Sequence, residues 1–150
     1  MPVNRNIAAL KPDLAAAVKR FLVKCAEQDV SVVIIETDRT QETQDAYYAQ
    51  GRQPLETVNS LRSKAGLYPL TETENRRITN AKVSNHTGGN AIDIAPEKIG
   101  LRGYPWWNAP QSVWEEIGAL AEQCGLDWCA GGYGQTWGKG WDNPHFELLR

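Results

Sequence analysis

The sequence has no excess of basic residues and no long hydrophobic run. Its 16 Lys and Arg residues are balanced by 18 Asp and Glu residues, which gives a formal net charge of −2. Proteins that neutralise nucleic-acid phosphates usually concentrate positive charge, so nucleic acid is not an expected partner. No segment approaches the roughly 20 apolar residues of a membrane-spanning helix, so we do not expect stable membrane insertion.

Cysteine is scarce, and no export signal is visible. The three cysteines are an odd number without a Cys-x-x-Cys pair: Cys25, Cys124 and Cys129. This pattern indicates reduced thiols rather than a disulfide framework or a zinc ribbon. The N-terminus lacks a basic start followed by an apolar run and a cleavage site. We therefore expect the protein to be made in the cytoplasm without a signal peptide.

Hydrophobic periodicity divides the chain into helices and strands. Apolar residues at helical spacing, together with start and stop signals, predict helices over 11–28, 40–50 and 114–124. Short β-branched or alternating runs predict strands over 30–35, 78–83, 91–95 and 145–150. The polar segment 53–77 contains a possible helical piece over 58–64. A length of 150 residues is typical of one domain.

Only two histidines occur, and each lies in a compact motif. His86 belongs to SNHTGGNAID, which ends at Asp93, and His145 belongs to WDNPHFE. An isolated histidine is more often structural than a metal ligand. The fixed spacing of the surrounding residues, however, is unlikely to arise by chance from average composition. Because Pro144 favours extended backbone at the residue before it, His145 is expected to begin a strand.

These two motifs resemble those of the zinc D-Ala-D-Ala carboxypeptidase and L-alanyl-D-glutamate endopeptidase family, which includes phage endolysins. The resemblance covers the chain from Arg39 onward. It implies that His86, Asp93 and His145 bind zinc, and that Asp142 occupies the place of the family's acid/base carboxylate. It also implies an α+β fold, in which a small antiparallel sheet carries the zinc site and about three helices flank it.

The residue types suit these roles as zinc ligands and as an acid/base residue. Two imidazoles and one carboxylate leave one zinc position open, as in catalytic sites, whereas structural zinc usually has four protein ligands. Zinc activates water and polarises a carbonyl, and Asp142 is close enough in sequence to His145 to move the proton. Glu147 is an alternative base. Its more ordinary role would be to orient His145, which lies two residues away on the same face of a strand.

Arg39 and Ser84 are candidates for substrate binding. The segment TDRT places Arg39 where the family has an arginine that clasps a substrate carboxylate, a task that suits the bidentate guanidinium. The family usually has a small lead-in such as SGYR, whereas ETD precedes the arginine here. The alternative for Arg39 is a surface salt bridge with Asp38 or Glu42. The alternative for Ser84 is a turn hydroxyl.

The resemblance implies a peptidase that acts on peptidoglycan stem peptides, and two reactions fit the same site. One removes a terminal D-alanine, and the other cuts the bond between L-Ala and D-Glu. The missing leader, the absence of an appended wall-binding domain in 1–150 and the segment AYYAQGR favour an L-alanyl-D-glutamate endopeptidase of the endolysin branch. The alternatives are a D-Ala-D-Ala carboxypeptidase or dipeptidase. A nonenzymatic zinc-containing domain, as in hedgehog proteins, is a further alternative against which Asp142 argues.

As a phage or prophage endolysin, the protein would be a monomer made in the host cytoplasm. It would reach the cell wall in the periplasm after a separate protein permeabilises the membrane. The segment 53–77 either covers the pocket or lines an open groove. The six tryptophans lie in the last third of the chain and are interpreted as core residues or as part of a substrate groove: Trp106, Trp107, Trp114, Trp128, Trp137 and Trp141.

Overall fold

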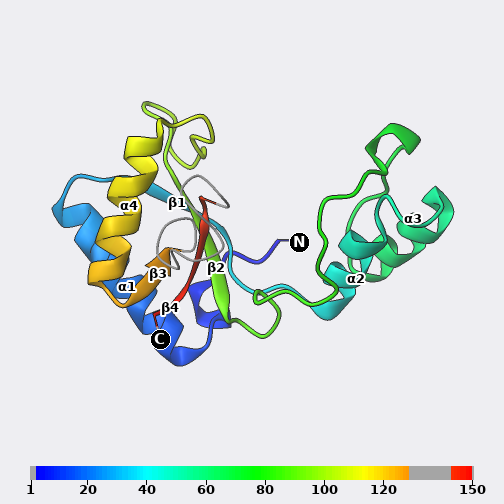
Figure 1. Cartoon of the computed structure of the whole chain (residues 1–150), viewed down its shortest axis with the longest axis horizontal. Coiled ribbons are helices and arrows are strands. Elements are labelled where there is room, and N and C mark those ends of the chain that lie inside the picture. Colours follow the sequence, from blue (N-terminus) through cyan, green and yellow to red (C-terminus); the bar gives the residue numbers. More distant parts are fainter. Residues whose placement is uncertain (1–2, 129–142, 150) are drawn as a thin grey trace.

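The computed structural model describes residues 3–128 and 143–149. Its α-helices are α1 (Pro12–Glu27), α2 (Gln41–Ala49), α3 (Leu55–Lys64) and α4 (Gln111–Gln123). Its strands are β1 (Val32–Glu36), β2 (Ala91–Pro96), β3 (Leu126–Trp128) and β4 (His145–Leu148), and short 3-10 turns cover Ile7–Ala9 and Glu72–Glu74. The predicted α+β fold is confirmed (Figure 1). Within the described part of the chain, each helix is too short or too polar to cross a bilayer.

The four strands form one antiparallel sheet in the order β1-β2-β4-β3. In the register between β2 and β4, Asp93 lies opposite His145 and Ile92 lies opposite Phe146. Successive side chains of a strand point to opposite faces. Ile92 and Phe146 are fully buried on one face, so Asp93 and His145 share the other. The sheet therefore places two of the three predicted ligands side by side.

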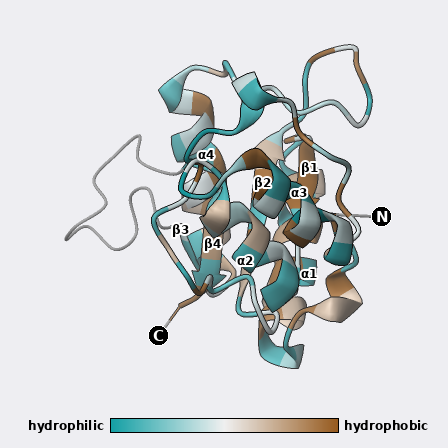
Figure 2. Ribbon diagram, turned by 90° about the vertical axis from the view of Figure 1, so that its right-hand side faces the viewer, coloured by the Kyte–Doolittle hydropathy of each residue, from teal (hydrophilic) through white to brown (hydrophobic). Residues whose placement is uncertain are grey.

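The apolar face of the sheet is covered by α1 and α4 (Figure 1). Buried residues of α1 recur at helical spacing, and Phe21 packs against Phe146 with their ring centroids 6.0 Å apart. In α4, Gly118 leaves room for the indole of Trp128, because a Cβ there would lie 2.3 Å from that ring. Figure 2 shows hydrophobic residues gathered around β1 and β2. This core fixes the strands that carry the site.

The α2 and α3 helices pack against each other and stand to one side of the sheet (Figure 1). The possible helical piece over 58–64 is real and begins earlier, at Leu55, directly after Pro54. The structure therefore has one more helix than the three principal ones expected. The prediction of a helix at 40–50 is close, since α2 begins after Thr40, whose hydroxyl accepts a hydrogen bond from the Thr43 N–H.

One strand prediction was wrong, and one strand was missed. The segment 78–83 has the composition of a strand but pairs with no strand of the described residues. Side chains take its carbonyls instead, since Gln44 donates to the Ala81 carbonyl and Gln41 donates to the Lys82 carbonyl. Conversely, β3 was not predicted, because three residues are too few to show alternation.

The tryptophans and cysteines divide between core and surface. Trp114 and Trp128 are buried in the core, as the simpler interpretation expected, whereas Trp107 is half exposed. Trp137, Trp141 and Cys129 lie outside the described residues. Cys25 and Cys124 are free thiols. Burial, with Cys124 nearby, raises the pKa of Cys25 to about 11, so this thiol is poorly suited to redox chemistry.

Candidate metal centre

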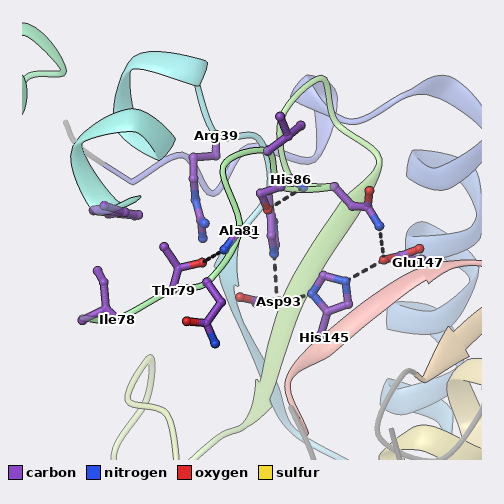
Figure 3. A pocket seen from close by; sticks show the side chains of 13 residues that line it. Arg39, Ile78, Thr79, Ala81, His86, Asp93, His145 and Glu147 are labelled. Carbon is purple, nitrogen blue, oxygen red and sulfur yellow. Dashed lines mark hydrogen bonds and ion pairs between the residues drawn. The ribbon is translucent and has the colours of Figure 1, made fainter. Parts of the chain in front are cut away.

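His86, Asp93 and His145 converge on one point from three parts of the chain. His86 lies in the loop before β2, Asp93 lies on β2, and His145 begins β4. Potential ligand atoms of the three residues all lie within 4.8 Å of one another. The Asp93 Oδ1 is 3.2 Å from the His86 Nε2 and 3.4 Å from the His145 Nδ1 (Figure 3). The structure thus brings together the three predicted ligands.

The spacing of these atoms fits a tetrahedral zinc ion. Zinc bonds to imidazole nitrogen and carboxylate oxygen are about 2.0–2.2 Å long, so two ligand atoms on a tetrahedron are about 3.3 Å apart. The distances of 3.2 and 3.4 Å around the Asp93 Oδ1 match this value. The donor set of two nitrogens and one oxygen is also one that zinc prefers. These residues therefore fit a catalytic metal that keeps an open position.

The outer nitrogen of each imidazole faces a hydrogen-bond acceptor. The His86 Nδ1 lies 3.2 Å from the Thr37 carbonyl oxygen, and the His145 Nε2 lies 2.8 Å from the Glu147 Oε2. When these outer nitrogens donate, the inner nitrogens turn lone pairs toward the Asp93 carboxylate. In that tautomer three electron-pair donors face one another, and a bound cation would stabilise them. This arrangement is typical of metal-binding histidines.

Asp93 is held in its charged form. Burial alone would raise the pKa of this carboxyl. When the imidazoles turn a protonated nitrogen toward it instead of a lone pair, hydrogen bonds and charge from His145 and His86 outweigh burial and hold the pKa well below its usual range. Metal binding requires a deprotonated carboxylate. Asp93 is therefore ready to act as a ligand across the whole neutral range.

The loop that carries His86 is pinned on several sides. The Arg39 N–H donates to the His86 carbonyl at 3.0 Å, and the Gly88 N–H donates to the Asp38 carboxylate at 3.1 Å. Gly89 has a φ of +75°, and a Cβ there would lie 2.6 Å from the Ala9 carbonyl oxygen, so only glycine fits this approach. The ligand is thus positioned by backbone contacts that leave it little freedom.

Ser84 takes part in this turn. Its hydroxyl accepts a hydrogen bond from the His86 N–H at 3.2 Å, so the turn role considered for it is present. Ser84 also lines the pocket beside the ligands. A substrate hydrogen bond from the same hydroxyl stays a prediction.

Arg39 lines the site, and its guanidinium is paired with neighbouring side chains. Its guanidinium donates through Nε and Nη2 to both carboxylate oxygens of Glu36 and through Nη1 to the Gln44 Oε1. Tyr47 covers one face, with its ring centroid 5.1 Å from the Arg39 Cζ. Burial alone would lower the pKa of Arg39, but the hydrogen bond and charge of Glu36 raise it overall. The ion-pair partner is therefore Glu36, not Asp38 or Glu42.

The three ligands face a cavity of about 940 Å³ that is open to solvent. Its wall combines Arg39 and Tyr47 from the α2 side with the segment 78–86 and the ligand-bearing strands: Ile78, Thr79, Asn80, Ala81, Val83, Ser84, Asn85, His86, Asp93, His145 and Glu147. Among the described residues, none of 53–77 contributes to this lining. The segment 53–77 packs beside α2 and neither covers nor lines the described pocket.

The sequence matches a known family over this part of the chain. Residues 77–148, just under half of the chain, match the model of the D-alanyl-D-alanine carboxypeptidase family. The match includes both histidine motifs. This part of the chain is therefore similar to a family of metallopeptidases. The resemblance found in the sequence is thereby confirmed, and so is the expectation of an enzyme. No curated protein sequence matches the chain.

Solved structures share the fold of this peptidase. The L-Ala D-Glu endopeptidase ChiX of Serratia marcescens is 16% identical, with a TM-score of 0.57, 96% of this chain covered and 84% of that one. The vancomycin resistance D,D-pentapeptidase VanY, in complex with Zn(II), is 12% identical with a TM-score of 0.54, covering 94% and 73%. The LD-carboxypeptidase LdcB is 16% identical with a TM-score of 0.56, covering 93% and 59%. At such identities the likeness concerns the fold.

Glu147 and Asn85 form hydrogen bonds that hold the ligand-bearing segments in place. The buried Glu147 Oε2 accepts from the Asn85 Nδ2 at 2.7 Å and faces the His145 Nε2 at 2.8 Å. Asn85 is next to His86, so this contact ties two ligand-bearing segments together. The arrangement agrees with the orienting role considered for Glu147. Asn85 was missed, because its partner lies 62 residues away.

Replacing Glu147 with glutamine should weaken metal binding by about 10- to 100-fold. A glutamine keeps one acceptor oxygen but brings an NH2 group against the Asn85 amide and the imidazole. Competition with a chromophoric chelator would measure the affinity, and circular dichroism would check the fold. The matched control is Glu56→Gln, since Glu56 is exposed on α3. Unchanged metal affinity together with a large loss of turnover would instead make Glu147 the base.

Asp142, the predicted acid/base residue, lies outside the described residues. Its position in sequence, three residues before the ligand His145, keeps it the candidate for proton transfer in this peptidase. The role rests on the motif and on the resemblance to the family.

Proposed function

We propose that this metallopeptidase uses zinc, held by His86, Asp93 and His145, to cleave stem peptides of bacterial peptidoglycan. The observation that carries the proposal is the convergence of the three ligand residues at the wall of an open cavity of about 940 Å³. The neighbouring folds ChiX, VanY and LdcB are named for activities on such peptides. Zinc, when bound, would supply a Lewis acid for the scissile carbonyl and would activate water.

The favoured bond is the one between L-Ala and D-Glu. An endopeptidase needs room for the peptide on both sides of the scissile bond. Figure 3 shows Thr79 and Ile78 on the side of the ligands away from Glu147, where the pocket wall offers room for a peptide beside the metal site. The likeness to an L-Ala D-Glu endopeptidase over 96% of this chain gives further support.

A D-Ala-D-Ala carboxypeptidase is the second candidate. The matching family model carries that description, and Arg39 lies in the pocket wall, where it would face a bound substrate. Its charge, however, is compensated by Glu36, which makes it a weak receptor for a free terminal carboxylate. The ion pair by itself does not separate the two reactions, because D-Glu in a stem peptide also carries a carboxylate next to the scissile bond.

The biological setting belongs to the same proposal. We infer a monomeric phage or prophage endolysin. It would be made in the host cytoplasm and would act on the wall in the periplasm once another protein has permeabilised the membrane. Similarity to a peptidase family argues against the nonenzymatic alternative.

Product analysis on purified Gram-negative sacculi tests the bond. After digestion by the zinc-loaded protein, mass spectrometry should detect released peptides that begin with D-Glu, and L-Ala should remain on the glycan. The matched control is the Asp93→Ala protein, which should release neither. Release of D-alanine alone would refute the endopeptidase and establish the carboxypeptidase.

A further inference from the structure

Glu36 lies beside the metal centre, although it has no place in the predicted site. It ends β1, is only 6% exposed, and lies opposite Asp93 in the register between β1 and β2, at an irregularity of the pairing. Residues directly opposite each other on paired strands project to the same face. Glu36, Asp93 and His145 thus form a row across three adjacent strands.

The contact with Glu36 uses the side of the Arg39 guanidinium that binds carboxylates best. The Nε and Nη2 atoms, which form a fork for two carboxylate oxygens, both donate to Glu36. Nη1 donates to Gln44 at 2.8 Å, and Gln44 is itself fixed by its 2.7 Å hydrogen bond to the Ala81 carbonyl. The pair is therefore held on three sides and cannot turn its fork toward a substrate.

The electrostatic consequence concerns what can bind next to Arg39. Arg39 still lines the pocket, with 16% of its side chain exposed. A substrate carboxylate there would be attracted by the guanidinium but repelled by the Glu36 carboxylate paired with it, so Glu36 reduces the net attraction that could offset the loss of water. A neutral carboxamide loses less solvation and can still accept a hydrogen bond. The pair thus disfavours a charged group at this position.

We propose that Glu36 is a specificity-determining residue that sets the subsite beside Arg39 for an uncharged amide. The substrate would be a stem peptide in which the residue after the scissile bond carries an amidated α-carboxyl group rather than a free carboxylate. This inference rests on the proposed endopeptidase function and specifies its substrate. It also explains why a buried carboxylate is placed so close to a metal ligand.

A matched pair of synthetic stem peptides tests the proposal. The two peptides are identical except that the α-carboxyl of D-Glu is free in one and amidated in the other. Binding to the zinc-loaded Asp142→Asn protein is measured by calorimetry, and cleavage by the wild type is measured as kcat/KM. The amidated peptide should bind at least about tenfold more tightly. Equal binding, or a preference for the free carboxylate, would overturn the proposal.

The Glu36→Gln substitution should reverse the preference. It leaves the charge of Arg39 uncompensated, so the ratio of the two dissociation constants should move by about tenfold or more toward the carboxylate peptide. Glu42→Gln is the control, because Glu42 is an exposed glutamate at the start of α2. The double variant Glu36→Gln/Arg39→Gln removes both charges and should keep the wild-type preference for the amidated peptide. This measurement tests the charge argument even if the single variant folds poorly. A double variant that prefers the carboxylate would contradict the charge argument.

The two proposals fail in different ways. If the wild type cleaves neither peptide, the endopeptidase function is wrong, while the ratio of dissociation constants still decides the subsite. If the wild type cleaves both peptides equally well and binds them equally, the function stands and the role of Glu36 is wrong.

Discussion

The Asp93→Ala protein is expected to lose at least about 1000-fold in peptidase activity. The loss follows from the metal, because a Lewis acid stabilises the transition state by several kcal/mol and each 1.36 kcal/mol corresponds to a factor of ten. Asp93 is central to the ligand group, since its Oδ1 lies within 3.4 Å of a nitrogen of each histidine. Its removal leaves two imidazoles, which are too few for a stable site. Metal content, measured on dialysed protein, should fall from about one per chain to a small fraction of that.

The fold should survive this substitution. Asp93 points away from the core face of β2, where Ile92 and Ile94 are fully buried. Asp13→Ala is a suitable control, because Asp13 is exposed at the start of α1. It should keep both metal and activity. Full metal content and undiminished turnover in Asp93→Ala would refute the assignment of this ligand.

The sequence predicted the ligand group because the relevant information is local. The compact motifs carry the resemblance that implied His86 and Asp93 as ligands, and the alternation in the strands indicated which neighbours face the core. The structure shows this pattern, since Phe146 packs against Phe21 while His145 faces Asp93. Local alternation of this kind predicts which face of a folded strand is buried, because burial of one face fixes the register of the strand.

The partners of the site were missed for two reasons. Glu36 lies only three residues before Arg39, but Asp38 and Glu42 are at least as near in sequence, so spacing alone does not select the partner. Asn85 meets Glu147 only after β4 pairs with β2. The false strand over 78–83 likewise reflects long-range contacts. Its composition fits a strand, but whether a strand forms depends on a neighbouring strand that can pair with its backbone N–H and C=O groups. In this protein, the side chains of Gln41 and Gln44 occupy that place.

The Asp142→Asn protein should keep its zinc but lose about 100- to 10,000-fold in kcat, the usual contribution of a general acid/base. Asparagine has nearly the same shape as aspartate, but its amide cannot accept the proton of the attacking water or return it to the leaving amine. Elemental analysis and kcat should be measured on the same preparation. Retained zinc with lost turnover separates this residue from Asp93, whose removal should abolish both.

The comparison with Glu147→Gln decides which carboxylate moves the proton. Glu147 Oε2 already contacts the Asn85 amide and the His145 imidazole at 2.7 and 2.8 Å, so moving it toward substrate would cost two hydrogen bonds to a buried charge. Asp142 carries no such requirement in the proposed mechanism. We therefore expect the loss of kcat at saturating zinc to be at least tenfold larger in Asp142→Asn than in Glu147→Gln. The opposite order, with zinc retained in both proteins, would assign proton transfer to Glu147.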